Sequence, residues 1–168
     1  MANGEGVAVA WDQWRTERPD LDLASMALFG GLKHAHAMLE LLLEPVFETS
    51  SINSAEFDVL FHLRHAPEPV IARRLAQTMG KSAAALSKAL TKLERRGLVV
   101  RAANPVDKRS FLVTISDAGA AAVDQAMPRR LALESEVVEA LTGRQRADIA
   151  RAFRVIGDVL ETTARRRT

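Results

Sequence analysis

The 168-residue sequence contains no cysteine, which excludes disulfide bonds, thiolate chemistry and cysteine-based zinc fingers. It has no run of about 18 apolar residues, so no membrane-spanning helix is predicted. The first residues, Met1–Trp14, carry neither the basic segment nor the long apolar segment of a signal peptide. Hydrophobic residues make up 48% of the chain, enough for a buried core. We therefore expect a globular cytoplasmic protein, built as one domain or as a small domain with added helices.

Acidic residues are scarce in one segment, Ile71–Phe111, which contains ten basic residues and only two acidic ones. This segment carries a net charge of +8, whereas the whole chain carries +2, so the remainder carries −6. A basic block within an acidic chain is typical of a nucleic-acid-binding module, because lysine and arginine neutralise phosphates. An ordinary solvated basic patch has the same charge, so charge alone leaves both interpretations open.

The chain also lacks the motifs of common catalytic sites. It has no nucleophile elbow, no glycine-rich phosphate loop and no HExxH motif. No pair of carboxylates is flanked by a histidine, and Glu134, Glu136 and Glu139 fall on an outer stretch of helix where they are expected to be solvated. We therefore expect that the protein is not an enzyme and that it holds no cofactor.

Apolar residues form a regular stripe in the N-terminal part of the chain, from Asp22 onward. They recur at alternating spacings of four and three, at Ala24, Leu28, Leu32, Ala35, Leu39, Leu42 and Val46. A stripe this long is typical of a coiled-coil seam, so residues 1–49 are expected to pair with a second copy of the chain. The alternative is that the stripe covers the core of its own domain. Pro45 should end or kink this helix, because proline has no N–H to bond back along it.

A second helix is expected to begin at Asn53. This residue can cap the helix, and Glu56, three residues later, completes the pattern of a capping box. The inner face of the helix is expected to consist of Phe57, Leu60 and Phe61.

The following segment has the length, turn chemistry and polarity of a helix-turn-helix motif. A short helix is expected over Ile71–Met79, followed by a tight turn at Gly80. Its inward residues are expected to be Ile71, Leu75, Ala76 and Met79. Ser82 can cap a second helix that runs to about Arg96, and Gly97 can close that helix.

Two apolar, β-branched runs then predict a β-hairpin. Leu98–Arg101 and Ser110–Ile115 are the expected strands, and Asn104–Arg109 supplies a turn-rich, charged tip. A hairpin directly after a recognition helix is a wing. Residues 50–116 are therefore expected to form one winged helix-turn-helix domain.

The C-terminal part of the chain, residues 117–168, is expected to form two more helices. Ser116 can cap the first, which should bend at Pro128, and Thr142 can open the second. The expected fold class is mainly α-helical with a small β-hairpin wing.

The second helix of the motif divides into two faces. Leu86, Leu90 and Leu93 follow the helical period and must face the core. The remaining positions carry small, hydroxyl-bearing or cationic side chains, and the candidate DNA-binding residues among them are Ser82, Ala84, Ser87, Lys88, Thr91, Lys92 and Arg95. Such a face suits the major groove, where small residues permit close approach and Lys88 can reach guanine acceptors. An ordinary solvated face is the alternative.

The hairpin tip adds three charged candidates for DNA binding, Asp107, Lys108 and Arg109. Arg109 is best placed to enter the minor groove, where narrow A·T-rich stretches concentrate negative potential. Asp107 is expected either to orient a neighbouring arginine through a charge-assisted hydrogen bond or to act as a turn former.

Four pieces of the sequence match a known family in their order and spacing. They are Glu56–Arg64 (EFDVLFHLR), Arg73–Met79 (RRLAQTM), Ser82–Arg101 (SAAALSKALTKLERRGLVVR) and Asp107–Gly119 (DKRSFLVTISDAG). The last piece contains the D-x-R signature of the wing tip. With these residues the region from Glu56 to Gly119 resembles the MarR family of bacterial transcriptional regulators.

The resemblance implies a winged-helix fold in which the N- and C-terminal helices of two chains form the interface of a homodimer. In this sequence those helices fall in residues 1–49 and 117–168. It also implies that two recognition helices enter successive major grooves of a pseudo-palindromic operator, with half-sites roughly 34–36 Å apart. Many members of the family are repressors, released when a small phenolic or other aromatic ligand binds between the dimer helices and the DNA-binding lobe.

The N-terminal segment, with Trp11, Trp14 and Arg18–Asp22, resembles a branch of the family that includes urate-responsive members. This resemblance implies that a tryptophan of the first helix and Asp58 help form an effector site. The candidate ligand-binding residues are Trp11, Trp14, Asp58 and Phe61. An arginine in the branch's recognition helix aligns with Ala89 here, and the loss of that cation argues against urate. The aromatic residues could equally belong to the core, and a DNA-binding module without an effector is the alternative.

Two histidines are candidates for metal ligands. His62 and His65 are three residues apart and could share a helix face with Asp58, a ligand combination that zinc accepts. Histidines at this spacing are more often ordinary surface or core residues, so no metal site is assigned.

Overall fold

The computed structural model describes residues 13–107 and 109–166 of the chain. Two candidate site residues, Trp11 and Lys108, therefore lie outside the described residues. The chain divides into two compact units, Met1–Thr49 and Ser50–Thr168. None of the helices within the described ranges combines the length and the apolar character needed to cross a lipid bilayer.

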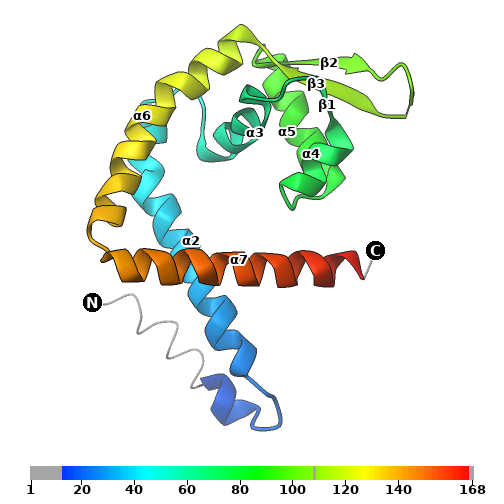
Figure 1. The fold of residues 1–168 in the computed structure, drawn as a ribbon. Coiled ribbons are helices and arrows are strands. Elements are labelled where there is room, and N and C mark those ends of the chain that lie inside the picture. Colours follow the sequence, from blue (N-terminus) through cyan, green and yellow to red (C-terminus); the bar gives the residue numbers. More distant parts are fainter. Residues whose placement is uncertain (1–12, 108, 167–168) are drawn as a thin grey trace. The chain divides into compact units, whose positions relative to one another are not determined.

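The first unit consists mainly of one long helix, α2, which covers Ala24–Glu48 (Figure 1). Asp22 accepts a hydrogen bond of 2.9 Å from the backbone N–H of Ala24 at its start. The expectation that Pro45 could end this helix is wrong, because α2 continues to Glu48. Proline removes only one backbone donor, and the neighbouring Leu43 and Val46 are buried, which stabilises the last turn.

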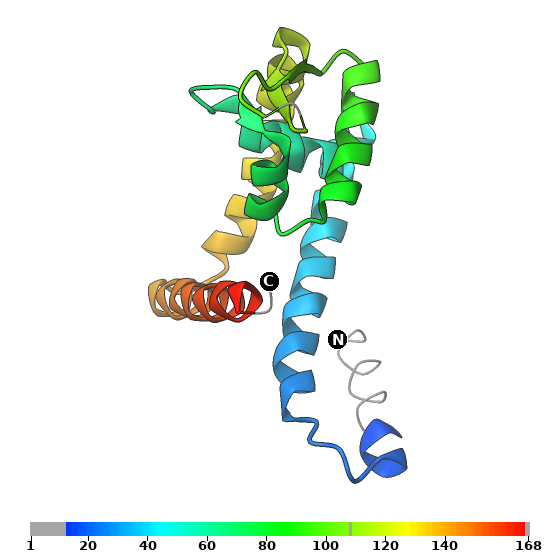
Figure 2. The same ribbon diagram turned by 90° about the vertical axis from the view of Figure 1, so that its right-hand side faces the viewer.

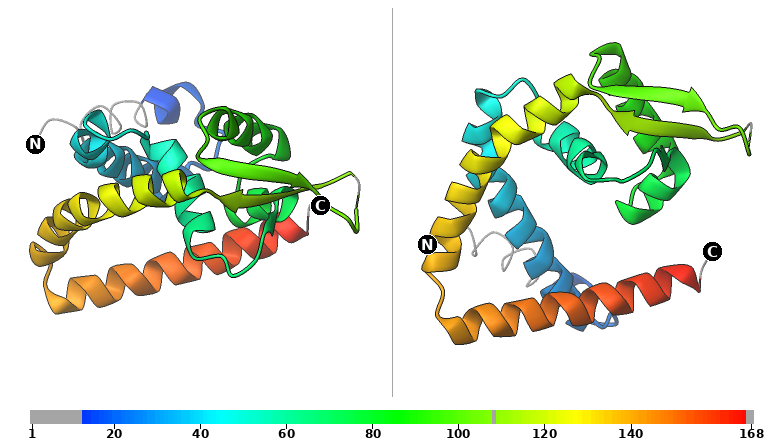
Figure 3. Two further views of the ribbon diagram at one scale, coloured as in Figure 1. Left: turned by 90° about the horizontal axis from the view of Figure 1, so that it is seen from above. Right: turned by 45° about the horizontal axis from the view of Figure 1, so that its top comes forward.

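The second unit contains the remaining long helices and a small sheet. Its elements are α3 (Ser54–Arg64), β1 (Val70–Ile71), α4 (Ala72–Thr78), α5 (Ala83–Arg95), β2 (Val99–Ala103), β3 (Phe111–Ile115), α6 (Asp117–Glu139) and α7 (Gly143–Arg165). The sheet is antiparallel with the strand order β1-β3-β2. Figure 2 shows α4 and α5 side by side, joined by a short turn. Figure 3 shows the β2–β3 hairpin extending beyond these helices as a wing, which confirms the expected fold class.

The starts of α3, α5, α6 and α7 are fixed by side-chain caps. The Asn53 side chain accepts from the backbone N–H of Glu56 at 2.9 Å, and the Glu56 carboxylate accepts from the N–H of Asn53 at 3.1 Å, which confirms the capping box. Ser82, Ser116 and Thr142 cap α5, α6 and α7, as predicted. Each cap satisfies backbone N–H groups that have no partner within the helix.

One strand of the sheet was not predicted. Val70 and Ile71 form β1, which pairs with Val113 and Leu112 of β3. The expectation that Ile71 begins α4 and faces inward is therefore wrong. Ile71 lies in β1 and is 38% exposed. A strand of two residues is too short to show a periodicity in the sequence. It forms because β3 offers backbone hydrogen-bonding groups with which it can pair.

The two halves of α6 differ in how deeply their side chains are buried. Its buried residues lie in the first half and are Gly119, Ala122, Val123 and Ala126. A Cβ atom added at Gly119 would lie only 2.1 Å from the carbonyl oxygen of Leu98, and the N–H of Ser116 donates to that same oxygen at 3.1 Å. The start of α6 is thus in direct contact with the residue that precedes β2. The helix continues through Pro128 to Glu139.

Candidate nucleic-acid interface

The two faces of α5 are separated as predicted. Leu86, Leu90 and Leu93 are at most 1% exposed and belong to the core. The candidate residues on its outer side are exposed, apart from the half-buried Thr91, and are Ser82, Ala84, Ser87, Lys88, Lys92 and Arg95. A closely packed leucine row therefore holds a small and cationic face toward solvent, as a helix that enters a groove of DNA requires.

A buried carboxylate, that of Glu56, joins the end of α5 to the start of α3. Its side chain is 7% exposed, and it lies 3.0 Å from Lys92 Nζ and 2.5 Å from Arg96 Nη1. Arg96 also donates to the carbonyl oxygen of Ser51. Burial alone would raise the pKa of Glu56, but the hydrogen bonds that it accepts, foremost from Arg96, outweigh burial and lower its pKa.

This ion pair has two consequences. Because the pKa of Glu56 is lowered in the folded state, the stability it contributes is present at neutral pH and decreases as the pH falls below about 4. Lys92 was predicted to bind DNA, yet its ammonium group is directed to Glu56. The local sequence pattern predicted only a capping role for Glu56 and did not indicate this second role.

The base of the wing is tied to α5 by Arg101 of β2. Its guanidinium lies 4.6 Å from the centre of the Phe111 ring and 3.6 Å from the carboxylate of Glu94. It also donates to the hydroxyl of Thr91 at 3.2 Å, and that hydroxyl donates to the carbonyl oxygen of Ser87 at 3.0 Å. The hydroxyl of Thr91, another candidate for DNA contact, is thus used within the protein to join α5 and the wing.

Hydrogen bonds within the wing tip define its shape. The Asp107 carboxylate accepts from the backbone N–H of Arg109 at 3.0 Å, and the Asp107 carbonyl oxygen accepts from the N–H of Ser110 at 3.0 Å. The Asn104 amide donates to the Ser110 hydroxyl at 2.9 Å and accepts from the N–H of Val106 at 2.9 Å. The side chain of Arg109 is exposed. The geometry of Asp107 matches a turn former, because its carboxylate bonds the backbone of the arginine.

This geometry predicts different outcomes for two substitutions of Asp107. Asp107→Ala removes the bond to the N–H of Arg109, worth about 1 kcal/mol, so DNA affinity should fall roughly fivefold. Asp107→Asn keeps an acceptor oxygen at the same place and should bind DNA within about twofold of the parent. Fluorescence anisotropy on a fixed DNA duplex measures both affinities. Equal losses in the two variants would instead favour a charge-assisted bond from Asp107 to an arginine side chain.

A hollow of about 480 Å³ lies between α4, α5 and the wing. Three guanidinium groups line it, those of Arg73, Arg101 and Arg109, together with the carboxylate of Asp107. Arg101 is already paired with Glu94, so Arg73 and Arg109 are the cations of this concave surface that favour contact with a phosphate backbone beside the exposed face of α5.

A second cavity, of about 560 Å³, lies between α3 and α6. Two stacked rings form part of its wall, with the centres of Phe57 and Phe61 5.9 Å apart. The guanidinium of Arg130 lies 4.9 Å from the centre of the Phe57 ring. It contacts Glu134 at 2.8 Å and Asp58 at 3.7 Å. The residues that line the cavity between α3 and α6 are Phe57, Asp58, Phe61, His62, Met127, Arg130, Leu131 and Glu134.

Two of the candidate ligand-binding residues, Asp58 and Phe61, line this α3–α6 cavity. The expectation that Phe61 belongs to the inner face of α3 is wrong, since 44% of this residue is exposed. Val59, Leu60 and Leu63 fill the inner face with Phe57, and Phe61 falls beside it. In residues 13–107 and 109–166, no group of three histidine, cysteine or acidic side chains is arranged to hold a metal ion.

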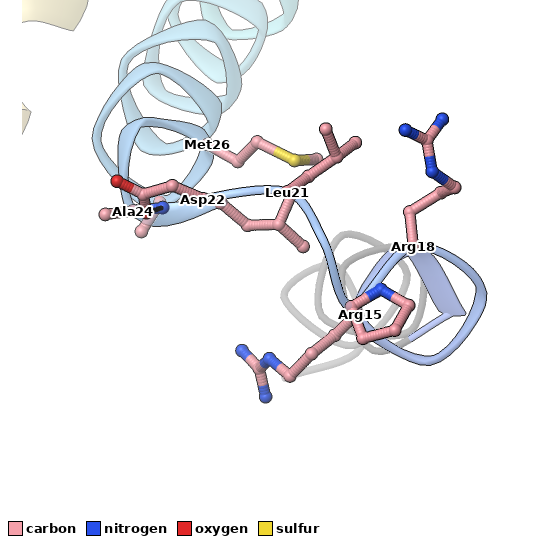
Figure 4. A pocket seen from close by; sticks show the side chains of 9 residues that line it. Arg15, Arg18, Leu21, Asp22, Ala24 and Met26 are labelled. Atoms are coloured by element: carbon pink, nitrogen blue, oxygen red, sulfur yellow. Dashed lines mark hydrogen bonds between the residues drawn. The ribbon is translucent and has the colours of Figure 1, made fainter.

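Trp14, the other described candidate, lies in the first unit and is 47% exposed. A hollow in that unit is lined by residues on both sides of Pro19 (Figure 4). In Figure 4 the side chains of Leu21 and Met26 lie close together, while those of Arg15 and Arg18 point away from them. Arg18 is bound to Asp20 through two hydrogen bonds of 2.8 and 2.7 Å. The polar groups of this hollow therefore do not converge on a common point.

Comparisons with known proteins agree with the DNA-binding geometry. A sequence profile described as the MarR family matches residues 50–110, which contain α3, the helix-turn-helix, β2 and the wing tip. The HTH-type transcriptional regulator PecS of Dickeya dadantii is 26% identical over 139 residues, which cover 82% of this chain and 84% of that protein.

Solved structures extend the likeness to the fold. A MarR variant from E. coli in complex with operator DNA has a TM-score of 0.71 and 26% identity, over 80% of this chain and 96% of that one. CouR from Rhodococcus jostii RHA1, bound to p-coumaroyl-CoA, has a TM-score of 0.64 and 22% identity, over 74% of this chain and 87% of that one.

Proposed function

The chain belongs to the MarR family of transcriptional regulators, and we propose that it is a repressor that binds a pseudo-palindromic operator as a homodimer. The recognition helix α5 enters the major groove, and the wing tip with Arg109 lies along the adjacent minor groove. The family consists of regulators of transcription, not of enzymes. We propose that the protein acts in the cytoplasm, where operator DNA is accessible.

The observation that carries this proposal is the exposed face of α5 next to the wing. Three core leucines fix the orientation of the helix, and Arg101 holds the wing beside it. The solved MarR–operator complex, with its similar fold, supports the assignment of this surface to DNA. Lys108 of the tip and, on α5, Ser82, Ala84, Ser87, Lys88 and Arg95 are proposed contacts on the same surface. The side chains of Thr91 and Lys92 bond within the protein.

A gel-shift titration tests the proposal directly. Duplexes from the region upstream of the protein's own gene should be bound at least 100-fold more tightly than scrambled duplexes of the same length. Binding should weaken steeply between 50 and 200 mM salt, because lysine and arginine contacts to phosphate release counterions. Equal, weak binding to both duplexes at physiological salt would show that the chain is not a sequence-specific regulator.

Exposed apolar stripes support the homodimer. In α2, three leucines of the predicted stripe are exposed, Leu28 at 59%, Leu32 at 36% and Leu39 at 37%. In α7 a row at spacings of four, three and four is formed by Ile149, Phe153, Ile156 and Leu160, and the helix has no buried residue. Apolar rows of this length rarely remain in contact with water. A second copy of the chain, placed against both helices, covers them in the proposed homodimer.

A substitution in α7 tests this interface. Phe153→Lys places a charge in the apolar row and should raise the dimer dissociation constant at least tenfold. Val155→Lys is the matched control, because Val155 is equally exposed but lies on another side of the helix. Sedimentation equilibrium compares the two variants. A parent chain that is monomeric at micromolar concentration, or a control that dissociates as readily as Phe153→Lys, would contradict the proposed use of this row.

We also propose that a small aromatic ligand regulates the repressor from the α3–α6 cavity. A volume of about 560 Å³ suits a molecule of one to three rings, and stacked phenylalanines line it. CouR, whose fold is similar, is bound to p-coumaroyl-CoA. Trp14 belongs to the first unit and Trp11 lies outside the described residues, so their role in ligand binding stays a prediction from the sequence. A ligand that binds the folded state should raise the melting temperature and lower operator affinity.

A further inference from the structure

The charged groups of the α3–α6 cavity do not balance. Its lining contains two carboxylates, Asp58 and Glu134, but one guanidinium, that of Arg130. With His62 counted as neutral, the formal charge of the lining is −1. A half-enclosed, largely apolar cavity with a surplus negative charge attracts cations and repels anions.

Arg130 is already engaged by the protein. Its Nε donates to Glu134 at 2.8 Å, and its guanidinium lies over the Phe57 ring at 4.9 Å. A ligand carboxylate would have to displace Glu134 from this position and leave that carboxylate without its partner. Glu134 is only about a third exposed, so water would compensate poorly for the loss.

Asp58 is held far more loosely. Its carboxylate is 3.7 Å from Arg130, longer than a hydrogen bond, and its side chain is 47% exposed. It can therefore accept hydrogen bonds from a ligand without losing one of its own in return. The ring of Phe61, stacked on Phe57, offers an exposed face beside it for a flat or cationic group.

We propose that the α3–α6 cavity selects flat aromatic molecules that carry a cationic or N–H-donating group, and discriminates against aromatic carboxylates. The ligand's ring stacks on Phe61, and its donor group bonds to Asp58. This inference rests on the proposed function in one respect, that the cavity is the effector site. It separates this chain from a regulator whose effector is an aromatic acid.

Three probes of nearly equal shape test the charge preference. They are 2-naphthamidine (a cation), 2-naphthamide (neutral) and 2-naphthoate (an anion). Isothermal titration calorimetry on the full chain without DNA should give an affinity for the amidine at least tenfold above that for the carboxylate, with the amide between them. Equal affinities, or tighter binding of the carboxylate, would overturn the proposal.

Substitutions of the two cavity carboxylates test whether these groups set the preference for a cationic ligand. Asp58→Asn should reduce the ratio of amidine to carboxylate affinity at least threefold, and Glu134→Gln should change it in the same direction. Asp158→Asn, on α7 and outside this cavity, should leave the ratio unchanged. An unchanged ratio in both cavity variants would contradict the assignment.

Operator binding distinguishes failure of this inference from failure of the proposed function. If none of the three probes binds while the same preparation binds operator DNA selectively, the ligand assignment is wrong and the DNA-binding function stands. If selective DNA binding also fails, the proposed regulatory role fails with it. Amidine binding that lowers operator affinity would support both proposals together.

Discussion

Replacement of Gly119 by alanine should lower the free energy of unfolding by about 3 kcal/mol, because the new methyl group overlaps a backbone oxygen. The added Cβ would lie 2.1 Å from the carbonyl oxygen of Leu98 and 2.9 Å from a side-chain carbon of Ile115. The oxygen belongs to the backbone beside β2 and cannot rotate away as the end of a flexible side chain could. Either α6 or the base of the wing has to shift.

The sign of the change in stability distinguishes the close contact from the usual effect of alanine in a helix. Within a helix, alanine is usually more stabilising than glycine by about 0.5–1 kcal/mol, so a helix without this close contact would gain from the substitution. Gly143→Ala is the matched control, since no atom lies within 4 Å of a Cβ added there. Its stability should equal that of the parent or exceed it by up to about 1 kcal/mol.

Urea denaturation of the two variants at one protein concentration measures the difference. The concentration must be fixed because subunit association contributes to the stability of a dimer. A Gly119→Ala variant as stable as the parent would show that α6 and the Leu98 backbone are not in close contact.

The second large effect is expected from Lys88, which should set part of the base preference of α5. Lys88→Ala should weaken operator binding by roughly 10- to 100-fold, as the loss of a good base contact does, and leave binding to scrambled DNA much less affected. Lys88 is exposed on the outer face of α5, opposite the leucines that hold the helix to the core.

Lys92, one turn further along the same helix, provides the comparison. Its ammonium group lies 3.0 Å from the buried carboxylate of Glu56, which Arg96 also contacts. Lys92→Ala should therefore leave the ratio of operator to scrambled affinity within about threefold of the parent, because Arg96 still anchors the end of α5. Anisotropy titrations at two salt concentrations separate the variants. Equal losses of selectivity for Lys88→Ala and Lys92→Ala would place both lysines on the bases.

A third substitution on the DNA-binding surface should act differently from both. Arg109→Ala removes a contact proposed for the minor groove, so it should weaken binding to most sequences and change the preference in the operator flanks. It should also lower the salt dependence of binding, because the variant releases one counterion fewer from the DNA when it binds. Wild-type salt dependence in this variant would contradict the placement of the wing.

The features that the sequence predicted correctly depend on residues close together in the chain. The caps at Asn53, Ser82 and Ser116 need only three or four consecutive residues to form their hydrogen bonds. The row of leucines in α5 follows from the helical period alone. These local rules were sufficient to place the recognition helix and its exposed face.

The features that the sequence did not predict depend on distant partners. Glu56 contacts Lys92 and Arg96 only because α3 packs near the end of α5, a relation that no local pattern contains. Phe61 fits the helical spacing of an inner residue, but α6 leaves a cavity at that point instead of filling it. β1 exists because β3 offers it a partner.

The continuity of α6 through Pro128 has a consequence for the angular relation of its two halves. Its first half is packed into the winged lobe, and its second half presents to solvent a row of Leu131 and Val138, which lie seven residues apart on one face. Each residue of a helix turns the chain by about 100°, so the number of residues between the halves sets the direction in which the exposed row points. Addition or loss of a single residue there would rotate that row by more than a quarter of a circle, whereas seven residues would nearly restore it. The length of α6 thus determines the direction in which its exposed row points relative to its packed first half.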